Sequence, residues 1–131
     1  MGYTAIKGNE HNWQERPSQH EGEPARHQTD ITTEASLQQS RARIFRYPPG
    51  SRGRRHQNFE QEEVFVVLDG TLTMLLGEPP ERVDLPPQSV CKVDVNTPLQ
   101  LFNAGDEDAT VFIYGAPPAT DQSEMLEDLA L

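Results

Sequence analysis

Residues 50–70 read GSRGRRHQNFEQEEVFVVLDG, and this stretch decides the predicted fold. It places His56 and Asn58 just ahead of an apolar run that is typical of a β-strand. Successive side chains of a strand point to opposite faces, so only one of Glu62 and Glu63 can face a pocket. The spacing to Gly70 favours Glu63. An imidazole, an amide and a carboxylate at these positions predict a pocket enclosed by β-strands.

Short apolar runs continue along the middle of the chain, interrupted by proline, glycine and asparagine, with no helical pattern between them. This pattern predicts an all-β fold, either an antiparallel sandwich or a barrel. Asp69 and Gly70 are a strong signal for a two-residue hairpin between the runs on either side, because both central residues of such a turn need positive φ. The expected strands are residues 41–47, 63–68, 71–76, 82–85, 89–95, 99–103 and 109–114.

A chain of 131 residues is long enough for one domain, and the strand pattern places it at residues 41–116. Residues 1–40 are rich in Glu, Gln, His, Pro and Ser, so they cannot bury enough apolar surface to fold independently. We expect an N-terminal arm that packs on the barrel or on a partner subunit. Trp13 and Ile31 are its predicted anchors.

Residues 117–131 are expected to form a tail or a short C-terminal helix. Asp121 or Ser123 could cap this helix, because short polar side chains accept hydrogen bonds from the first free amides. Its apolar face would contain Met125, Leu126 and Leu129. Packing or a dimer contact is the expected role of that face.

Charge is unevenly distributed along the chain. Residues 1–55 contain nine Lys or Arg and six Asp or Glu, whereas residues 56–131 contain two and fifteen, which gives +3 and −13 for a total of −10. An acidic protein repels nucleic acid and anionic membranes at long range, so neither is an expected partner. The sequence also contains no bilayer-spanning apolar run and no secretory leader, so we expect a cytoplasmic protein. Cys91 is the single cysteine, so no intrachain disulfide can form.

The spacing of Gly50, His56, Asn58, Glu63 and Gly70 resembles the first signature of the cupin superfamily. Over roughly residues 41–116, this resemblance implies a small single-domain cupin, with a jelly-roll β-barrel of two antiparallel sheets. It also implies a homodimer in which the arm and the sheet edges are exchanged between subunits. The family's signature normally carries a second histidine at the position of Asn58. The counterpart of its second signature carries Leu99 where another histidine belongs, so the resemblance implies a degenerate metal-binding motif.

Three interpretations of this predicted site stay open. In the first, His56, Glu63 and, weakly, Asn58 hold a divalent first-row metal, Fe, Mn, Ni or Zn, whose shell is completed by water or substrate. In the second, no metal is bound, and His56 and Glu63 form a pair suited to general acid or base catalysis. In the third, the two side chains only satisfy hydrogen bonds inside a closed barrel and specify the fold.

Six arginines lie within residues 41–55. Arg54 and Arg55 precede His56 in the predicted loop, and they either orient an anionic ligand or serve as ordinary surface charges. The three arginines in the expected strand of residues 41–47 should lie on its solvent-facing side, paired with acidic residues of this chain or of a second subunit. These strand residues are Arg41, Arg43 and Arg46.

The expected function is the binding of a small molecule, a carboxylated or otherwise anionic metabolite, with enzymatic action on it left open. His56 and Glu63 are the candidate catalytic residues. The candidate ligand-binding residues are Arg54, Arg55, Asn58 and Leu99. The alternative is a non-catalytic sensor or interaction module without a metal, because the cupin fold supports both kinds of protein.

Overall fold

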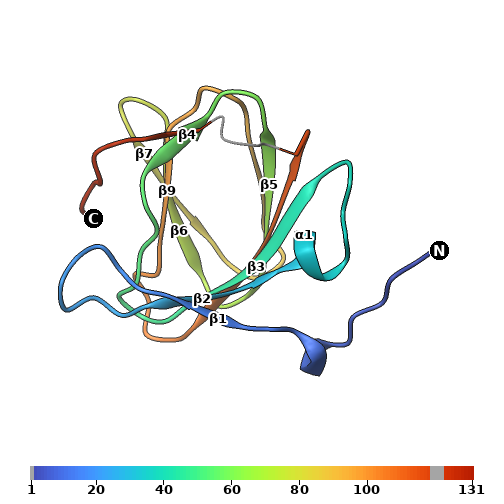
Figure 1. The fold of residues 1–131 in the computed structure, drawn as a ribbon. Helices are drawn as coiled ribbons and strands as arrows, with labels where there is room; N and C mark the ends of the chain where they lie inside the picture. The colour runs from blue at the N-terminus through green and yellow to red at the C-terminus, as the bar shows by residue number, and fades with distance from the viewer. Residues whose placement is uncertain (1, 119–122) are drawn as a thin grey trace.

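The computed structural model describes residues 2–118 and 123–131. Its strands form two antiparallel sheets that face each other, one ordered β1-β2-β3-β10-β5-β8 and the other β11-β4-β9-β6-β7 (Figure 1). The predicted all-β jelly roll is confirmed. The elements are η1 Gly8–Glu10, β1 Gln14–Arg16, β2 Arg26–Asp30, α1 Ile31–Glu34, β3 Arg41–Tyr47, β4 His56–Asn58, β5 Glu62–Asp69, β6 Leu72–Leu76, β7 Glu81–Leu85, β8 Val90–Val93, β9 Leu99–Phe102, β10 Ala109–Ala116 and β11 Ser123–Met125.

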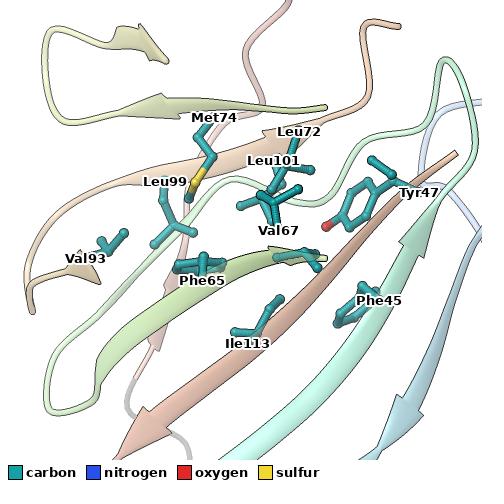
Figure 2. Packing of buried hydrophobic residues seen from close by; sticks show 12 residues of the cluster. Phe45, Tyr47, Phe65, Val67, Leu72, Met74, Val93, Leu99, Leu101 and Ile113 are labelled. Atoms are coloured by element: carbon teal, nitrogen blue, oxygen red, sulfur yellow. The ribbon is translucent and has the colours of Figure 1, made fainter. Parts of the chain in front are cut away.

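The hydrophobic core lies between the two sheets, where alternate residues of β3, β5, β6, β9 and β10 point inward (Figure 2). Phe65 is 2% exposed, and Val67, Leu72 and Met74 are fully buried. Each such side chain contributes about 1.5–3 kcal/mol on burial. The core cluster consists of Phe45, Tyr47, Phe65, Val67, Leu72, Met74, Val93, Leu99, Leu101, Ala109, Val111 and Ile113.

The hairpin predicted at Asp69 and Gly70 is wrong. Strand β5 pairs with β10 and β8, whereas β6 pairs with β7 and β9, so the chain passes from one sheet to the other at this turn. Gly70 has φ +69°, but Asp69 does not have the positive φ that the hairpin turn requires. A Cβ at Gly70 would lie 2.2 Å from the carbonyl oxygen of Asp108, so the glycine permits a close backbone approach to the start of β10.

The N-terminal arm extends the six-stranded sheet. Strand β2 pairs with the edge of β3, and β1 pairs with β2 (Figure 1). The guanidinium carbon of Arg46 lies 4.3 Å from the ring centre of Trp13, a cation–π contact that fastens the arm to the outer face of β3. Ile31 begins α1, which contacts the same strand. The arm gains its order from this pairing, because its own sequence has too little apolar surface.

The short helix predicted at the C-terminus is wrong. Ser123–Met125 form strand β11, whose register pairs Ser123 with Asn58 and Met125 with His56. Without β11, strand β4 would have unpaired backbone amides and carbonyls on the edge that faces away from β9, so pairing with this edge favours a strand. A helix of a few residues, in contrast, is unstable in water by itself. The predicted cap Asp121 lies outside the described residues. No helix in residues 2–118 or 123–131 has the length and apolar character needed to cross a membrane.

Candidate ligand-binding site

A cavity of ≈ 380 Å³ opens inside the barrel at the end where His56 and Glu63 lie. We call it the inner cavity. Phe65, Leu99 and Ile113 point into the space between the sheets (Figure 2) and form part of its apolar floor. Polar and charged side chains form the remaining wall. The lining of the inner cavity therefore combines apolar side chains with charged and polar ones, as ligand pockets commonly do.

Glu63 is the acidic residue of this cavity, and its side chain is 3% exposed. The Arg43 guanidinium donates to Oε2 over 3.1 Å, and the Asn58 amide donates to Oε1 over 2.8 Å. Burial alone would raise the pKa of Glu63, but the nearby His56 imidazole, the Arg43 charge and the Asn58 amide together lower it below the ordinary value. Glu63 is therefore ionised at neutral pH.

His56 enters the cavity from β4, with its Nε2 3.9 Å from Glu63 Oε1. This separation exceeds a hydrogen bond, so Glu63 attracts this ring only when the imidazole is protonated. On the other side of the ring, Nδ1 lies 3.1 Å from the carbonyl oxygen of Arg54. A carbonyl can only accept, so Nδ1 carries the proton of the neutral imidazole and Nε2 keeps its lone pair towards Glu63. Nε2 can thus accept a proton, and Glu63 can stabilise the resulting charge.

Arg41 and Arg43 line the inner cavity, contrary to the prediction that the strand arginines face solvent. They share the inward face of β3 with Phe45 and Tyr47, and only Arg46 lies on the outer face, against Trp13. Burial, followed by the nearby Arg41, lowers the pKa of Arg43 to about 10, and Glu63 opposes the shift. Strand alternation alone does not say which face is inside. Phe45 and Tyr47 occupy the same face of the strand as Arg41 and Arg43, and two aromatic residues on one face indicate that this face is buried.

Arg16 and Arg26 also line the cavity, although their place in the sequence does not mark them as candidates. They come from β1 and β2 of the arm, where they are direct cross-strand partners. Arg26 packs over Phe45, with 5.0 Å between its guanidinium carbon and the ring centre. Nothing in the polar sequence of the arm marks either residue, because their approach to the cavity depends on the pairing of β2 with β3.

The remaining candidates separate into two groups. Arg54, Asn58 and Leu99 line the inner cavity, and Leu99 is the strand partner of His56. Arg55 does not line it, because its guanidinium donates to Glu78 over 2.9 Å. Neighbouring residues in an extended segment point in opposite directions, which separates Arg54 from Arg55.

The donor set does not fit a tightly held divalent metal. Both oxygens of Glu63 already accept N–H groups, and Asn58 directs its NH₂ group towards this carboxylate. Arg43, 3.1 Å from Glu63, supplies positive charge where a metal would have to bind. Leu99 offers no ligand atom beside His56. Within the described part of the chain, no three His, Cys, Asp or Glu residues are grouped closely enough to hold an ion.

The sequence model of the cupin domain matches residues 43–114, more than half of the chain. The protein belongs to the cupin family. The matched segment of this cupin contains Arg43, His56, Asn58, Glu63 and Leu99, whereas the arginines of β1 and β2 lie before it. No curated protein matches the chain.

Many solved structures have similar folds, among them the following three. A sugar phosphate isomerase of the cupin superfamily from Silicibacter pomeroyi has 19% identity and a TM-score of 0.73, over 86% of this chain and 75% of that one. A predicted oxalate decarboxylase from Thermotoga maritima has 17% identity and a TM-score of 0.76, over 87% and 99%. The polyketide cyclase RemF from Streptomyces resistomycificus has 11% identity and a TM-score of 0.77, over 96% and 87%.

These similarities establish the fold of the cupin and no activity, since the identities are low. A further solved structure, from Acidithiobacillus ferrooxidans, is a longer chain: the cupin spans 62% of its length, with 18% identity and a TM-score of 0.66.

Proposed function

We propose that this cupin binds an anionic small molecule in the inner cavity and acts on it without a metal. One observation carries the proposal: five arginines and one glutamate line the cavity, a formal charge of +4 with histidine neutral, in a protein of net charge −10. Guanidinium groups around a partly apolar cavity focus positive potential there and attract anions.

The proposed chemistry is proton transfer. His56 Nε2 would accept a proton from the bound molecule, while Glu63, held ionised, would stabilise the imidazolium. Arg43 and Asn58 would act as positioning residues, because they hold both Glu63 oxygens. Arg41, which lines only the inner cavity, would face the anionic group of the ligand. The names of two solved relatives agree with this proposal, since sugar phosphates and oxalate are anions.

Binding can be tested with benzoate and its neutral analogue benzamide, using isothermal titration calorimetry at two salt concentrations. We expect benzoate to bind and benzamide to bind more weakly. Removing one charged contact costs about 1.5–3 kcal/mol, so Arg41→Gln should weaken benzoate binding roughly 10-fold to 100-fold. Arg82→Gln is the matched control, because Arg82 is exposed and pairs with Asp84 outside the cavity. Equal binding of both compounds, or no effect of Arg41→Gln, would favour the non-catalytic interaction module.

We also propose a second copy of the cupin as a partner. Leu68, Val90 and Tyr114 are 50%, 64% and 41% exposed on the outer face of the six-stranded sheet. Phe112 lies on this face, where its ring stacks on that of Tyr114 with 6.4 Å between the ring centres, and it is not part of the core cluster. A contiguous apolar surface of this kind is typical of an interface.

A further inference from the structure

A second cavity of ≈ 190 Å³ borders the inner cavity, and we call it the outer cavity. The two cavities have five lining residues in common: Arg16, Arg26, Gly53, Arg54 and Met125. Three arginines therefore border both spaces. We refer to Arg16, Arg26 and Arg54 as the arginine triad.

The arginine triad carries positive charge that the protein does not neutralise. Arg16 and Arg26 are direct partners across β1 and β2, an arrangement that is destabilising for like charges. Among the described residues, no member of the triad forms an ion pair. The Nε of Arg26 is buried without a hydrogen-bond partner. A buried unpaired donor costs free energy, so this site is incomplete without an acceptor.

Neutral contacts hold two members of the triad in place. Nη1 of Arg26 donates to the Tyr47 hydroxyl over 3.3 Å, and its guanidinium also packs over the Tyr47 ring. Gly53 leaves room for this contact, because a Cβ there would lie 3.0 Å from the Tyr47 hydroxyl. The side-chain oxygen of Gln19, in the orientation that satisfies its neighbours, accepts from Arg54 Nε over 3.0 Å and Nη1 over 2.8 Å. These contacts orient the guanidinium groups without cancelling their charge.

The acidic groups near the outer cavity are engaged elsewhere. Asp128 lines this cavity, but its Oδ2 lies 2.7 Å from His20 Nε2 and its Oδ1 accepts from the Arg55 amide over 2.8 Å. Glu23 pairs with Arg52 over 3.0 Å. Neither carboxylate is therefore committed to the triad.

We propose that the arginine triad binds the phosphate of a phosphate monoester, whose organic part extends through the inner cavity towards His56 and Glu63. Three cations without an acidic partner suit a group of nearly two negative charges better than a single carboxylate. The fork of N–H groups on each guanidinium also matches phosphate oxygens. This inference rests on the proposed function, because it requires that the inner cavity takes a small molecule, and it adds a separate subsite.

Phenyl phosphate, benzoate and inorganic phosphate test the inference, with dissociation constants measured by calorimetry at constant ionic strength and about pH 7.5, where the phosphate is mainly doubly charged. Phenyl phosphate should bind at least about 10-fold more tightly than benzoate. Arg16→Gln should weaken phenyl phosphate roughly 10-fold to 100-fold and benzoate by less than about 3-fold. Inorganic phosphate should bind weakly with the same dependence on Arg16.

Arg54→Gln provides an independent second variant, and Arg82→Gln again serves as the control that should change nothing. If phenyl phosphate and benzoate bind equally, or if Arg16→Gln and Arg54→Gln weaken both compounds alike, the phosphate subsite is refuted while anion binding by the inner cavity stands. If neither compound binds, both the subsite and the proposed function fail.

Discussion

The pair formed by Glu63 and Arg43 should contribute strongly to the stability of this cupin. The substitution Glu63→Gln keeps the shape of the side chain but removes its charge, so Arg43 loses its ionic partner in a buried site. The two side chains are only 3% and 17% exposed. Breaking a buried pair in this way costs about 3–5 kcal/mol, a large part of the roughly 5–15 kcal/mol that stabilises an ordinary domain.

The geometry shows why glutamine cannot replace glutamate. Arg43 donates to one oxygen of Glu63 and Asn58 donates to the other. The glutamine side chain of the Glu63→Gln variant would have one oxygen and one NH₂ group, so one of these two donors would face another donor. The unmet hydrogen bond costs about 1–3 kcal/mol and forms part of the expected loss.

Urea unfolding followed by circular dichroism measures this loss. We expect the free energy of unfolding to fall by about 3–5 kcal/mol with an unchanged urea dependence, and the melting temperature to fall by roughly 10–20 °C. In a double-mutant cycle, Arg43→Met combined with Glu63→Gln should cost at least about 2 kcal/mol less than the sum of the single changes.

The exposed pair of Lys92 and Asp94 is the control, with an oxygen–nitrogen distance of 2.8 Å. Asp94→Asn should leave the free energy of unfolding essentially unchanged, since exposed ion pairs contribute little. A loss of under about 1 kcal/mol for Glu63→Gln, or strictly additive changes in the cycle, would refute the assigned role of the pair.

The site, the turn and the sheet surface each give a further prediction. The difference in the free energy of unfolding between wild type and Glu63→Gln should be constant above pH 4.5, the ordinary pKa of a glutamate carboxyl. It should shrink as the pH falls through the lowered pKa of Glu63 in the folded protein, which acid unfolding curves would show. A constant difference down to pH ~2 would contradict this expectation. Gly70→Ala should lower the free energy of unfolding by about 2–4 kcal/mol in urea, because the new Cβ adds a backbone clash to the strain of a positive φ. Gly77→Ala should cost only about 1–2 kcal/mol, because Gly77 also has a positive φ but a Cβ there would lie 3.8 Å from the carbonyl oxygen of Pro79. Equal losses for the two variants would show that the close backbone approach at Gly70 does not matter. Tyr114→Arg should convert the proposed homodimer to a monomer in sedimentation equilibrium, and a wild-type monomer at high concentration would refute the dimer.

Much of the fold could be predicted from sequence, because strand alternation and turn residues are local. The β-rich pattern and the signature around His56 and Glu63 led to an antiparallel jelly roll and to the cupin family. The pairing of strands across the Asp69–Gly70 turn could not be predicted, because a tight turn can equally well join strands of opposite sheets. The C-terminal residues likewise formed β11 because the edge of β4 was available, a partner that no local propensity describes.

The sequence by itself determined which chemical groups were available: the His56 imidazole, the Glu63 carboxylate, an excess of arginine in the first half, and Leu99 in place of a ligand. Only the tertiary structure decided which of these groups meet. Arg16 and Arg26 reach the cavity through pairing of the arm with β3, while Arg55 turns away to Glu78. The physical reason is that net charge is additive along a chain, whereas its neutralisation depends on distances of a few ångströms between residues far apart in sequence.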